Sequence, residues 1–403
     1  MSRETLFDGL RVIDFANFIA GPSAATILAD FGADVIKVEP PGIGDGARRT
    51  FRLENLPNSE RDYVWDLLGR NKRSICLDLR REEGRDILMR LAQDADIAVT
   101  NMLPRQRKAL DLDYERFHAL NPRLIYALLS GHGDCGPEMN RPGFDATTFW
   151  ARSGLADLVR PSVEAQPASL TAGAGDQSTA LALFGAIMTA LWRRERTGQG
   201  GRVSSTLIGN GIWSNGVYVQ AALNGAEMVY REPYTRPRNA MTNFYPSADG
   251  RWLILSLIKS DEAWPTLLEV LDRQALASDP RFDTPQGRRD NATALAAELT
   301  QAFRAKPAAD WRALFERAGL TVGMVAQPGD ARDDAQMRAA GAIVEAAHLP
   351  GGLTIDSPLT IDGIEKRPPG PAPEKGAHSR EILEAMGFSA DEIDGFYNSG
   401  LIE

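Results

Sequence analysis

The chain has 403 residues, 25% of them charged, and a formal net charge of -9 at pH 7. Its length is too great for one small hydrophobic core and predicts two domains, while the acidic charge argues against nucleic acid or an anionic membrane as the main partner. The two cysteines, Cys76 and Cys135, do not suffice for a disulfide framework, and the spacing of the four histidines does not fit a metal site.

The sequence shows no pattern for secretion or membrane insertion. Residues Met1 to Thr5 are polar, which is not typical of a signal peptide. The longest apolar stretch, residues 180–192, is too short to cross a bilayer as a helix. We therefore expect a cytoplasmic protein with no membrane partner.

Short apolar strands alternate with helices in the first third of the chain. The predicted strands are 11–15, 34–38, 74–79, 97–100 and 124–130, and the predicted helices are 23–31, 82–93 and 114–120. This alternation predicts an α/β fold with an open, doubly wound, Rossmann-like parallel sheet. Ligands bind outside the carboxyl ends of such strands, so residues 17–21, 39–46, 101–107 and 131–145 should converge on one crevice.

The order of predicted elements changes after residue 225. A long helix (176–196), a strand (203–207) and a helix (208–223) precede a proline-rich linker at 231–238. A hairpin with its turn at 248–250 and helices at 262–271, 288–303 and 308–318 follow. We expect a large α/β domain at 1–225, a small α+β domain at 230–320, and a return to the large domain at 321–403. That last part includes a polyproline-like strap (367–373), a helix at 379–386 and a terminal helix from residue 390.

A glycine loop follows the predicted strand 124–130. Residues 131–136 match the spacing GxGxxG, but Pro137 and Pro142 prevent a helix from starting there, so a dinucleotide fingerprint is not expected. The loop instead permits a ligand to approach the backbone closely. Within it, His132 is either an acid–base group or a hydrogen-bonded loop histidine.

Two aspartates are predicted at helix N-termini. Asp145 ends the turn Arg141-Pro142-Gly143-Phe144-Asp145 and is expected to be the N-cap of the following helix, and Asp176 is expected to cap the helix at 176–196. A helix N-terminus stabilises an ionised carboxylate. Each aspartate is therefore either a simple cap or a reactive carboxylate.

Basic residues gather near predicted strand ends. They are Arg48, Arg49, Lys72, Arg73, Arg105, Arg107 and Lys108. Each one alone is typical of a solvated surface charge. Together, around one crevice, they indicate recognition of phosphate.

Several stretches together resemble one known family. They are Val12 to Phe15, Ala20 to Pro22, Leu28 to Pro40, Asn71 to Leu79, Asn121 to Tyr126, Arg141 to Asp145, Arg194 to Gly198 and Lys375 to Leu383. In these stretches the chain resembles the class III CoA-transferases. That family includes formyl-CoA, carnitine and bile-acid CoA-transferases and α-methylacyl-CoA racemase.

The resemblance implies a fold and a reaction. The family has a large α/β domain built from both chain ends, a small domain, and an interlocked homodimer. It uses no metal and no permanently bound cofactor, and coenzyme A or acyl-CoA is a substrate. CoA moves from an acyl-CoA donor to a free carboxylic acid through an aspartyl anhydride and an aspartyl-CoA thioester. By this resemblance Asp145 is the nucleophile. The backbone N–H groups of the glycine loop, at Gly131, His132 and Gly133, are candidates to stabilise the oxyanion of such a reaction.

The resemblance also implies a CoA site at the strand ends. The candidates by position are Phe18, Ala20, Lys72, Arg73, Asn101, Met102 and Arg105. Residues 102–105 read Met-Leu-Pro-Arg here, where many members read Phe-Arg-Pro-Gly. The basic residue that meets the CoA phosphates is therefore left open.

Two alternatives remain. The racemase branch has a histidine directly before the first aspartate, and it moves an α-proton between that histidine and a second aspartate that matches Asp176. Here Phe144 takes the histidine's place, which favours transfer, and only His132 lies near enough in sequence to substitute. The other alternative is a CoA-ester binding protein without catalysis.

Two departures from the formyl-CoA-type transferases concern the substrate. Those enzymes carry a glutamine where this chain has Ile19, and a run of glycines that is missing here before Tyr245. Both departures argue against formate and oxalate as substrates.

Overall fold

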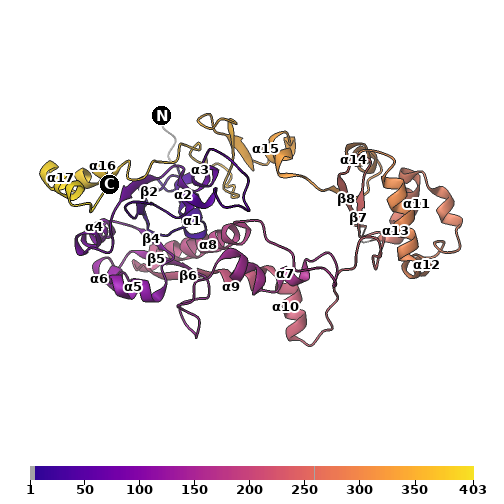
Figure 1. Cartoon of the computed structure of the whole chain (residues 1–403), viewed down its shortest axis with the longest axis horizontal. Coiled ribbons are helices and arrows are strands. Elements are labelled where there is room, and N and C mark those ends of the chain that lie inside the picture. Colours follow the sequence, from indigo (N-terminus) through magenta and orange to yellow (C-terminus); the bar gives the residue numbers. More distant parts are fainter. Residues whose placement is uncertain (1–4, 258) are drawn as a thin grey trace. The chain divides into compact units, whose positions relative to one another are not determined.

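The computed structural model describes residues 5–257 and 259–403, which form two compact units (Figure 1). Unit 1 contains the chain up to Leu155, residues 169–223 and residues 334–403. Unit 2 contains residues 156–168 and 224–333. The unit boundaries therefore differ from the predicted ones, since the segment 156–168 joins unit 2 and the chain leaves that unit only after Asp333.

Unit 1 is built on a six-stranded sheet in which every neighbouring pair is parallel. The strand order is β3-β2-β1-β4-β5-β6. The strands are β1 (Arg11–Asp14), β2 (Asp34–Glu39), β3 (Arg73–Cys76), β4 (Ile97–Thr100), β5 (Ile125–Ser130) and β6 (Gly201–Thr206). This confirms the predicted α/β fold with a parallel sheet, and the order of strands reverses between β1 and β4.

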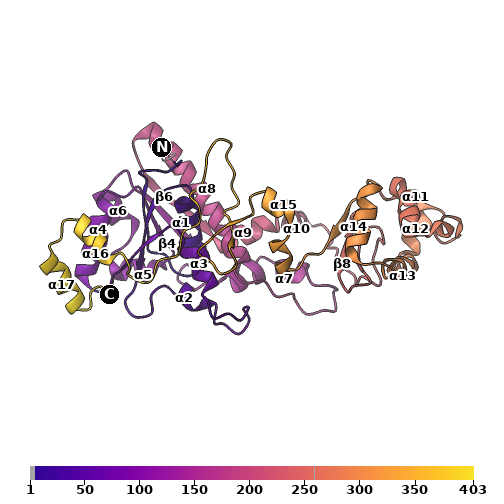
Figure 2. The same ribbon diagram turned by 90° about the horizontal axis from the view of Figure 1, so that it is seen from above.

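Helices cover both faces of this sheet (Figure 2). Helices α1 (Ala20–Asp30) and α8 (Ala174–Thr197) pack on one face. The other face is covered by α4 (Glu82–Gln93), α6 (Tyr114–Leu120), α16 (Ser379–Ala385) and α17 (Ala390–Asn398). Burial on both faces explains why the central strands are apolar along their whole length, as in β5, where every residue is buried.

The remaining elements of unit 1 are short. They are α2 (Ala47–Thr50), α3 (Tyr63–Gly69), α5 (Pro104–Leu110), the π-helix η1 (Asp145–Ala151), α9 (Leu207–Ser214), α10 (Gly216–Leu223), α15 (Ala335–Ala339) and the hairpin β10 (Ile343–Glu345) and β11 (Leu353–Ile355). The helix α7 (Leu155–Leu158) begins in unit 1 and ends in unit 2. The predicted single helix 208–223 is interrupted at the buried Asn215, whose side-chain amide donates to the carbonyl of Ser153 at 2.9 Å.

The proline-rich strap is hydrogen-bonded to unit 1. The backbone N–H of Arg367 donates to the carbonyl of Asp30 at 2.7 Å, and that of Gly370 donates to Asn71 Oδ1 at 2.9 Å. Trp65 Nε1 donates to the carbonyl of Pro373 at 2.9 Å. The C-terminal part of the chain thus returns to the unit in which the chain begins.

Unit 2 is an α+β unit around an antiparallel sheet. Its strands are β7 (Phe244–Pro246), β8 (Trp252–Leu255) and β9 (Val322–Met324), and its helices are α11 (Ser260–Leu271), η2 (Gln274–Ser278), α12 (Pro285–Asp290), α13 (Ala292–Phe303), α14 (Ala308–Arg317) and η3 (Pro328–Arg332). The predicted hairpin is confirmed. The return to the large domain at 321 was placed too early, because β9 pairs with β8 and completes the small sheet.

No helix within 5–257 and 259–403 combines the length and the apolar character needed to cross a membrane.

Candidate active site

A cavity of about 300 Å³ lies at the carboxyl end of the parallel sheet. Its wall includes residues 17–20 after β1, residues 101–103 after β4, and residues 129–131 at the end of β5. This is where the order of strands reverses, the usual position of a ligand in a doubly wound sheet. Three of the four stretches expected to converge therefore do so, and the fourth, 39–46, contacts the cavity wall from behind through Asp45.

Asp145 lies in this wall, but it does not cap its own helix. Phe144 occupies the N-cap position of η1, and Asp145 is the first residue of that helix. Its Oδ1 instead accepts a hydrogen bond of 3.0 Å from the backbone N–H of Gly175, at the start of α8. The carboxylate therefore faces the positive end of a helix other than the predicted one.

A glycine at position 175 makes this contact possible. A Cβ atom at Gly175 would lie 2.2 Å from Asp145 Oδ1 and 2.3 Å from the ring of Phe149. No side chain fits in that space, since carbon and oxygen do not approach so closely without a bond. Gly175 thus permits the carboxylate to reach the N-terminus of α8.

The charge of Asp145 is only partly stabilised. Burial raises the pKa of Asp145 above its usual value, and the backbone N–H groups of Gly173, Gly175 and Asp176 offset this only in part. Its Oδ2 is buried and has no hydrogen-bond partner among the described residues. A buried carboxylate oxygen without a partner is costly and is typical of functional sites.

Asp176 lines the same cavity. It is the third residue of α8, and the predicted N-cap position is taken by Gly173, whose φ of 84° favours glycine. Burial, together with the nearby charge of Asp145, raises the pKa of Asp176 to about 7. Within the described part of the chain its carboxylate accepts no hydrogen bond and lines the cavity, although it is largely buried.

The glycine loop and the turn before Asp145 cross at close range. A Cβ on Gly131 would lie 2.6 Å from the Cα of Gly143, so both positions require glycine. Gly131 lines the cavity, whereas the N–H of Gly133 already donates to Ser130 Oγ at 3.1 Å. Of the three loop residues expected at the site, only Gly131 therefore meets the cavity.

His132 lies behind this crossing and is not part of the cavity wall. Its Nε2 is 3.5 Å from Thr148 Oγ1, and its Nδ1 is 3.9 Å from Glu138 Oε2. Its side chain is only 7% exposed. Its Nδ1 is buried and has no hydrogen-bond partner among the described residues, so the choice between an acid–base group and a loop histidine stays a prediction.

Four of the seven predicted CoA-binding residues line the cavity: Phe18, Ala20, Asn101 and Met102. Asn101 ties two loops together, since its Oδ1 accepts from the N–H of Asn17 at 2.9 Å and its Nδ2 donates to the carbonyl of Asn17 at 2.7 Å. Arg105 is exposed in the first turn of α5, between the cavity residues Leu103 and Gln106. Arg105 itself is not part of the cavity wall.

Lys72 and Arg73 are placed differently. Lys72 is buried, with its ammonium 2.9 Å from Asp14 Oδ2 and 2.7 Å from the carbonyl of Pro22. Arg73 pairs with Asp34 at 2.6 Å and Glu381 at 3.0 Å. Both cations are neutralised by carboxylates, and neither lines the cavity. The assignment of these two residues to CoA binding thus has no support in the geometry.

The structure adds residues that were not among the predicted site residues. They are Asn17, Ile19, Leu103, Gln106, Leu129, Ser130, Pro142, Gly143, Phe144 and Leu207. Most of them are direct neighbours of predicted residues on the same strand-end loops, which was the available signal. Leu207 had no such signal, because it joins the site only through the pairing of β6 with β5.

The described residues include no group of three or more histidine, cysteine, aspartate or glutamate side chains able to hold a metal ion.

Comparison with known proteins adds the family to this geometry. A family model described as CoA-transferase family III matches residues 7–379. The chain belongs to CoA-transferase family III. It is therefore an enzyme of the CoA-transferase type, and the resemblance inferred from the sequence is confirmed.

Relatives of this family III enzyme match along almost its entire length. The chain is 30% identical to an (R)-2-hydroxy-4-methylpentanoate CoA-transferase of Clostridioides difficile, over 98% of this chain and 99% of that protein. It is 31% identical to a succinyl-CoA–D-citramalate CoA-transferase of Chloroflexus aurantiacus, over 96% of this chain and 95% of that one. A crystal structure of a CAIB/BAIF family protein from Brucella suis matches with a TM-score of 0.84 and 28% identity, over 95% of this chain and 100% of that one.

Proposed function

We propose that this enzyme moves CoA from an acyl-CoA donor to a free carboxylic acid, with an aspartate of the cavity as the covalent carrier. The observation that carries the proposal is the pair Asp145 and Asp176 in one cavity at the switch point of the sheet. Neither carboxylate has a cationic partner among the described residues. Two carboxylates without a countercharge are expensive to bury, which is typical of a site kept for chemistry.

We assign the attack to Asp176 and a supporting role to Asp145. One oxygen of Asp145 is held by a hydrogen bond from Gly175, whereas the carboxylate of Asp176 lines the cavity and accepts no hydrogen bond within the described part of the chain. The raised pKa of Asp176 also makes its ionised form a stronger nucleophile. The assignment predicted from the sequence, attack by Asp145, is the alternative that the experiment must separate.

The proposed reaction proceeds in balanced steps. The ionised carboxylate attacks the thioester carbonyl and expels the CoA thiolate, which leaves a mixed anhydride. The thiolate then attacks the aspartyl carbonyl of the anhydride, which releases the donor acid and leaves an aspartyl-CoA thioester. The acceptor carboxylate then attacks the aspartyl-CoA thioester and expels the CoA thiolate, which gives a second mixed anhydride. The thiolate attacks the acceptor's carbonyl in that anhydride, which releases the new acyl-CoA and regenerates the aspartate. Each step exchanges one bond at a carbonyl carbon and needs no external oxidant, reductant or net proton.

CoA itself is proposed to lie along the loops after β1 and β4. Ala20, Asn101 and Met102 line the cavity, and the exposed guanidinium of Arg105 forms no ion pair within the described part of the chain. Arginine binds phosphate well because its planar donors match two phosphate oxygens. Arg105 is therefore our candidate for the CoA phosphates, in place of Lys72 and Arg73.

Racemisation remains the second candidate, and the geometry favours it less. It needs a base opposite Asp176, but Phe144 stands where a histidine would be required, and His132 lies outside the cavity wall. The relatives compared above are transferases that act on different acids, so the acceptor is proposed only as a carboxylic acid. An interlocked homodimer and a cytoplasmic location are further proposals that rest on the family resemblance and the sequence.

The test combines CoA exchange with mapping of the covalent carrier. The enzyme is incubated with acetyl-CoA, succinyl-CoA and butyryl-CoA and a pool of free carboxylic acids, and new CoA esters are identified by mass spectrometry. Borohydride then reduces the trapped thioester, and peptide mapping locates the modified aspartate. Asp176→Asn and Asp145→Asn are run in parallel.

We expect a new acyl-CoA from the wild type, a modified Asp176, and no adduct in Asp176→Asn. A modified Asp145 would transfer the nucleophilic role to that residue and leave the reaction class intact. Exchange of the α-proton in heavy water without any new ester would overturn the proposal in favour of racemisation.

A further inference from the structure

Phe18 has an unusual backbone conformation. Its φ is 64°, in the left-handed region that a bulky side chain rarely occupies. Its side chain is 50% exposed and lines the cavity. The chain thus accepts both a strained backbone and an exposed phenyl ring at this position, and strain of this kind persists only where the surroundings impose it.

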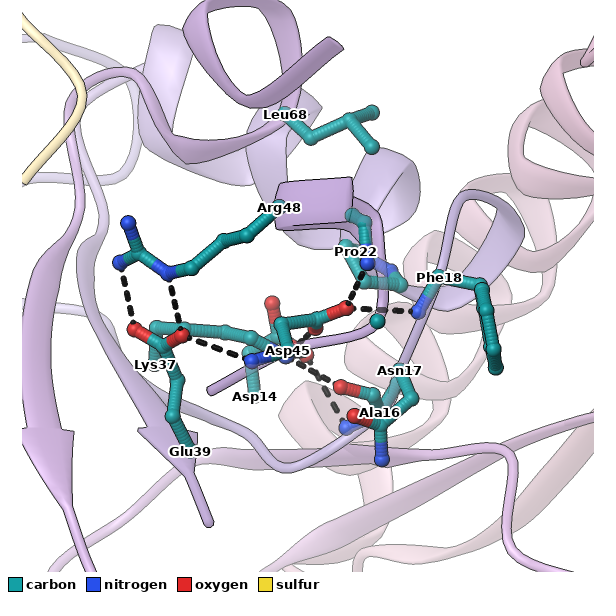
Figure 3. A network of polar contacts seen from close by, with 12 residues as sticks. Asp14, Ala16, Asn17, Phe18, Pro22, Lys37, Glu39, Asp45, Arg48 and Leu68 are labelled. Atoms are coloured by element: carbon teal, nitrogen blue, oxygen red, sulfur yellow. Dashed lines mark hydrogen bonds and ion pairs between the residues drawn. The ribbon is translucent and has the colours of Figure 1, made fainter. Parts of the chain in front are cut away.

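Asp45 is hydrogen-bonded to the backbone of Phe18 and of Ala47 (Figure 3). Its Oδ1 accepts from the N–H of Phe18 at 2.9 Å and from the N–H of Ala47 at 2.8 Å. The adjacent Gly46 leaves room for the ring, since a Cβ there would lie 2.6 Å from the Phe18 ring. The β2–α2 loop thereby supports the β1–α1 loop from behind the cavity wall.

Lys37 holds Asp45 in place. Its ammonium lies 2.7 Å from Asp45 Oδ2 and 3.5 Å from Asp14 Oδ1, and all three side chains are fully buried. The same ammonium donates to the carbonyl of Ala16, in the loop that follows β1. One buried cation therefore joins Asp45 to Asp14, the last residue of β1, and to Ala16, two residues before Phe18 (Figure 3).

We propose that the buried Lys37–Asp45 ion pair is a positioning element that holds Phe18 in its left-handed conformation, so that the exposed ring forms the wall on which the apolar part of the acyl-CoA substrate packs. Phe18 then contributes to substrate specificity, and Lys37 and Asp45 act through it. This inference rests on the proposed CoA-transferase function and names the substrate class of that same site.

The chemistry of the cavity wall indicates which substrates this arrangement favours. Phe144 is 58% exposed in the same wall, and Ile19, Met102 and Leu103 add further apolar surface. Apolar surface of this kind, next to the two carboxylates, favours an acyl group with a hydrocarbon portion over a purely polar one. We therefore infer a preference for apolar acyl chains of a few carbons.

The test measures binding without turnover. Titration calorimetry compares free CoA with S-butyl-CoA, a thioether that has no carbonyl to attack. We expect the wild type to bind the thioether more tightly than CoA, and Phe18→Gly to weaken thioether binding about tenfold more than it weakens CoA binding. Because glycine accepts a positive φ, the melting temperature of Phe18→Gly should equal or exceed that of the wild type.

A double-mutant cycle tests the positioning role. Asp45→Asn should weaken thioether binding several-fold in the wild-type background and have almost no further effect in Phe18→Gly, because both changes act through the same ring. Asp30→Asn is the matched control. Asp30 forms a buried ion pair with Arg70, with 2.7 Å between the charged atoms, and it does not line the cavity. That control should lower the melting temperature and leave both affinities unchanged.

Each remaining outcome overturns a defined part of the inference. Equal thioether binding by Phe18→Gly and the wild type would remove the role of the ring, and the Phe18 result stands even if Asp45→Asn does not fold. Additive effects of the Phe18 and Asp45 substitutions would remove the positioning role. A wild type that binds neither ligand would contradict CoA binding itself, and thus the proposed function rather than this inference alone.

Discussion

Asp14, Glu39 and Asp45 lie close to the cavity with ammonium or guanidinium partners, whereas Asp145 and Asp176 face the cavity without any among the described residues. Burial alone would raise the pKa of Asp14, but Lys37 and Lys72 outweigh it and hold that pKa below its usual value. Burial also acts on Asp176, and there the nearby charge of Asp145 adds to it, so the pKa rises to about 7.

At this edge of the sheet, the carboxylates with a cationic partner stabilise the structure, and the carboxylates without one are available for the reaction. A neutralised carboxylate is a weak nucleophile but a rigid anchor, because its oxygens are fixed by charge and hydrogen bonds. An uncompensated carboxylate costs stability and remains reactive. If this contrast holds, a change at an unpaired carboxylate should affect the reaction first, and a change at a paired one should affect stability first.

Removal of the Asp176 carboxylate should stop transfer. In Asp176→Asn we expect the rate to fall by on the order of 10³-fold or more, since an amide cannot form the anhydride. Steady-state kinetics with any active donor and acceptor pair measures this, with calorimetry of CoA binding as the control for an intact site. A rate within tenfold of the wild type would contradict the assignment.

Removal of the buried Lys37 cation should instead lower the stability of the fold. In Lys37→Met the carboxylates of Asp14 and Asp45 lose a partner inside the core, and we expect a loss of about 3 kcal/mol in the free energy of unfolding. Urea denaturation gives this value. Asp176→Asn, which removes an uncompensated charge, should not destabilise the protein at pH 8. Equal destabilisation by the two variants would erase the contrast.

Separation of Asp145 from the start of α8 should be less costly. The added methyl group of Gly175→Ala meets Asp145 Oδ1 and Phe149, and we expect a loss of about 2 kcal/mol in stability together with impaired transfer. Gly185 lies in the same helix, and an added Cβ there would meet no described atom within 4 Å beyond its chain neighbours and the adjacent helix backbone, so Gly185→Ala should be neutral or slightly stabilising. The two melting temperatures, measured together, separate the specific contact from general helix propensity.

The pH dependence should show the smallest effect. A pKa of about 7 for Asp176 means that its ionised fraction, and hence kcat/KM, rises about tenfold between pH 6 and pH 8.

Stability should also depend on pH. The folded state holds the proton of Asp176 more tightly than the unfolded state, so this carboxyl lowers stability as pH rises from about 4 to 7. For Asp14 the sign is opposite, since its contribution is lost only as pH falls through its lowered pKa. In Asp145→Asn the midpoint of any remaining activity should fall, and an unchanged midpoint would contradict the coupling.

Part of the site was predictable because it depends on local sequence. The strand–helix–strand order at 11–38 predicted a parallel sheet, and the position of the loop at 101 placed Asn101 and Met102 at its carboxyl edge, where the structure has them. The limits of helix α4 agree with the predicted range because both its apolar spacing and its flanking residues are local. Contacts between residues on different strands leave no comparable pattern in the local sequence, so they were not predicted.

The errors share one cause. Lys72 resembled a phosphate ligand because its partner Asp14 lies 58 positions away and is adjacent only after β1, β2 and β3 assemble. Asp145 resembled the cap of its own helix because α8, whose first turn it actually meets, begins 29 positions later in the chain (Asp145 to Ala174). Likewise, β9 resembled a return to the large domain until its pairing with β8 was known.

The sequence by itself determined the family, the alternation of strands and helices, and the loops that carry the site, because these follow from short-range periodicity and from motifs of a few residues. Only the tertiary structure decided which charges meet. The free energy of a carboxylate depends on neighbours within a few ångströms, and those neighbours come from distant parts of the chain. That is why Asp14 became an anchor and Asp176 a carboxylate with a raised pKa, although the two residues are the same amino acid.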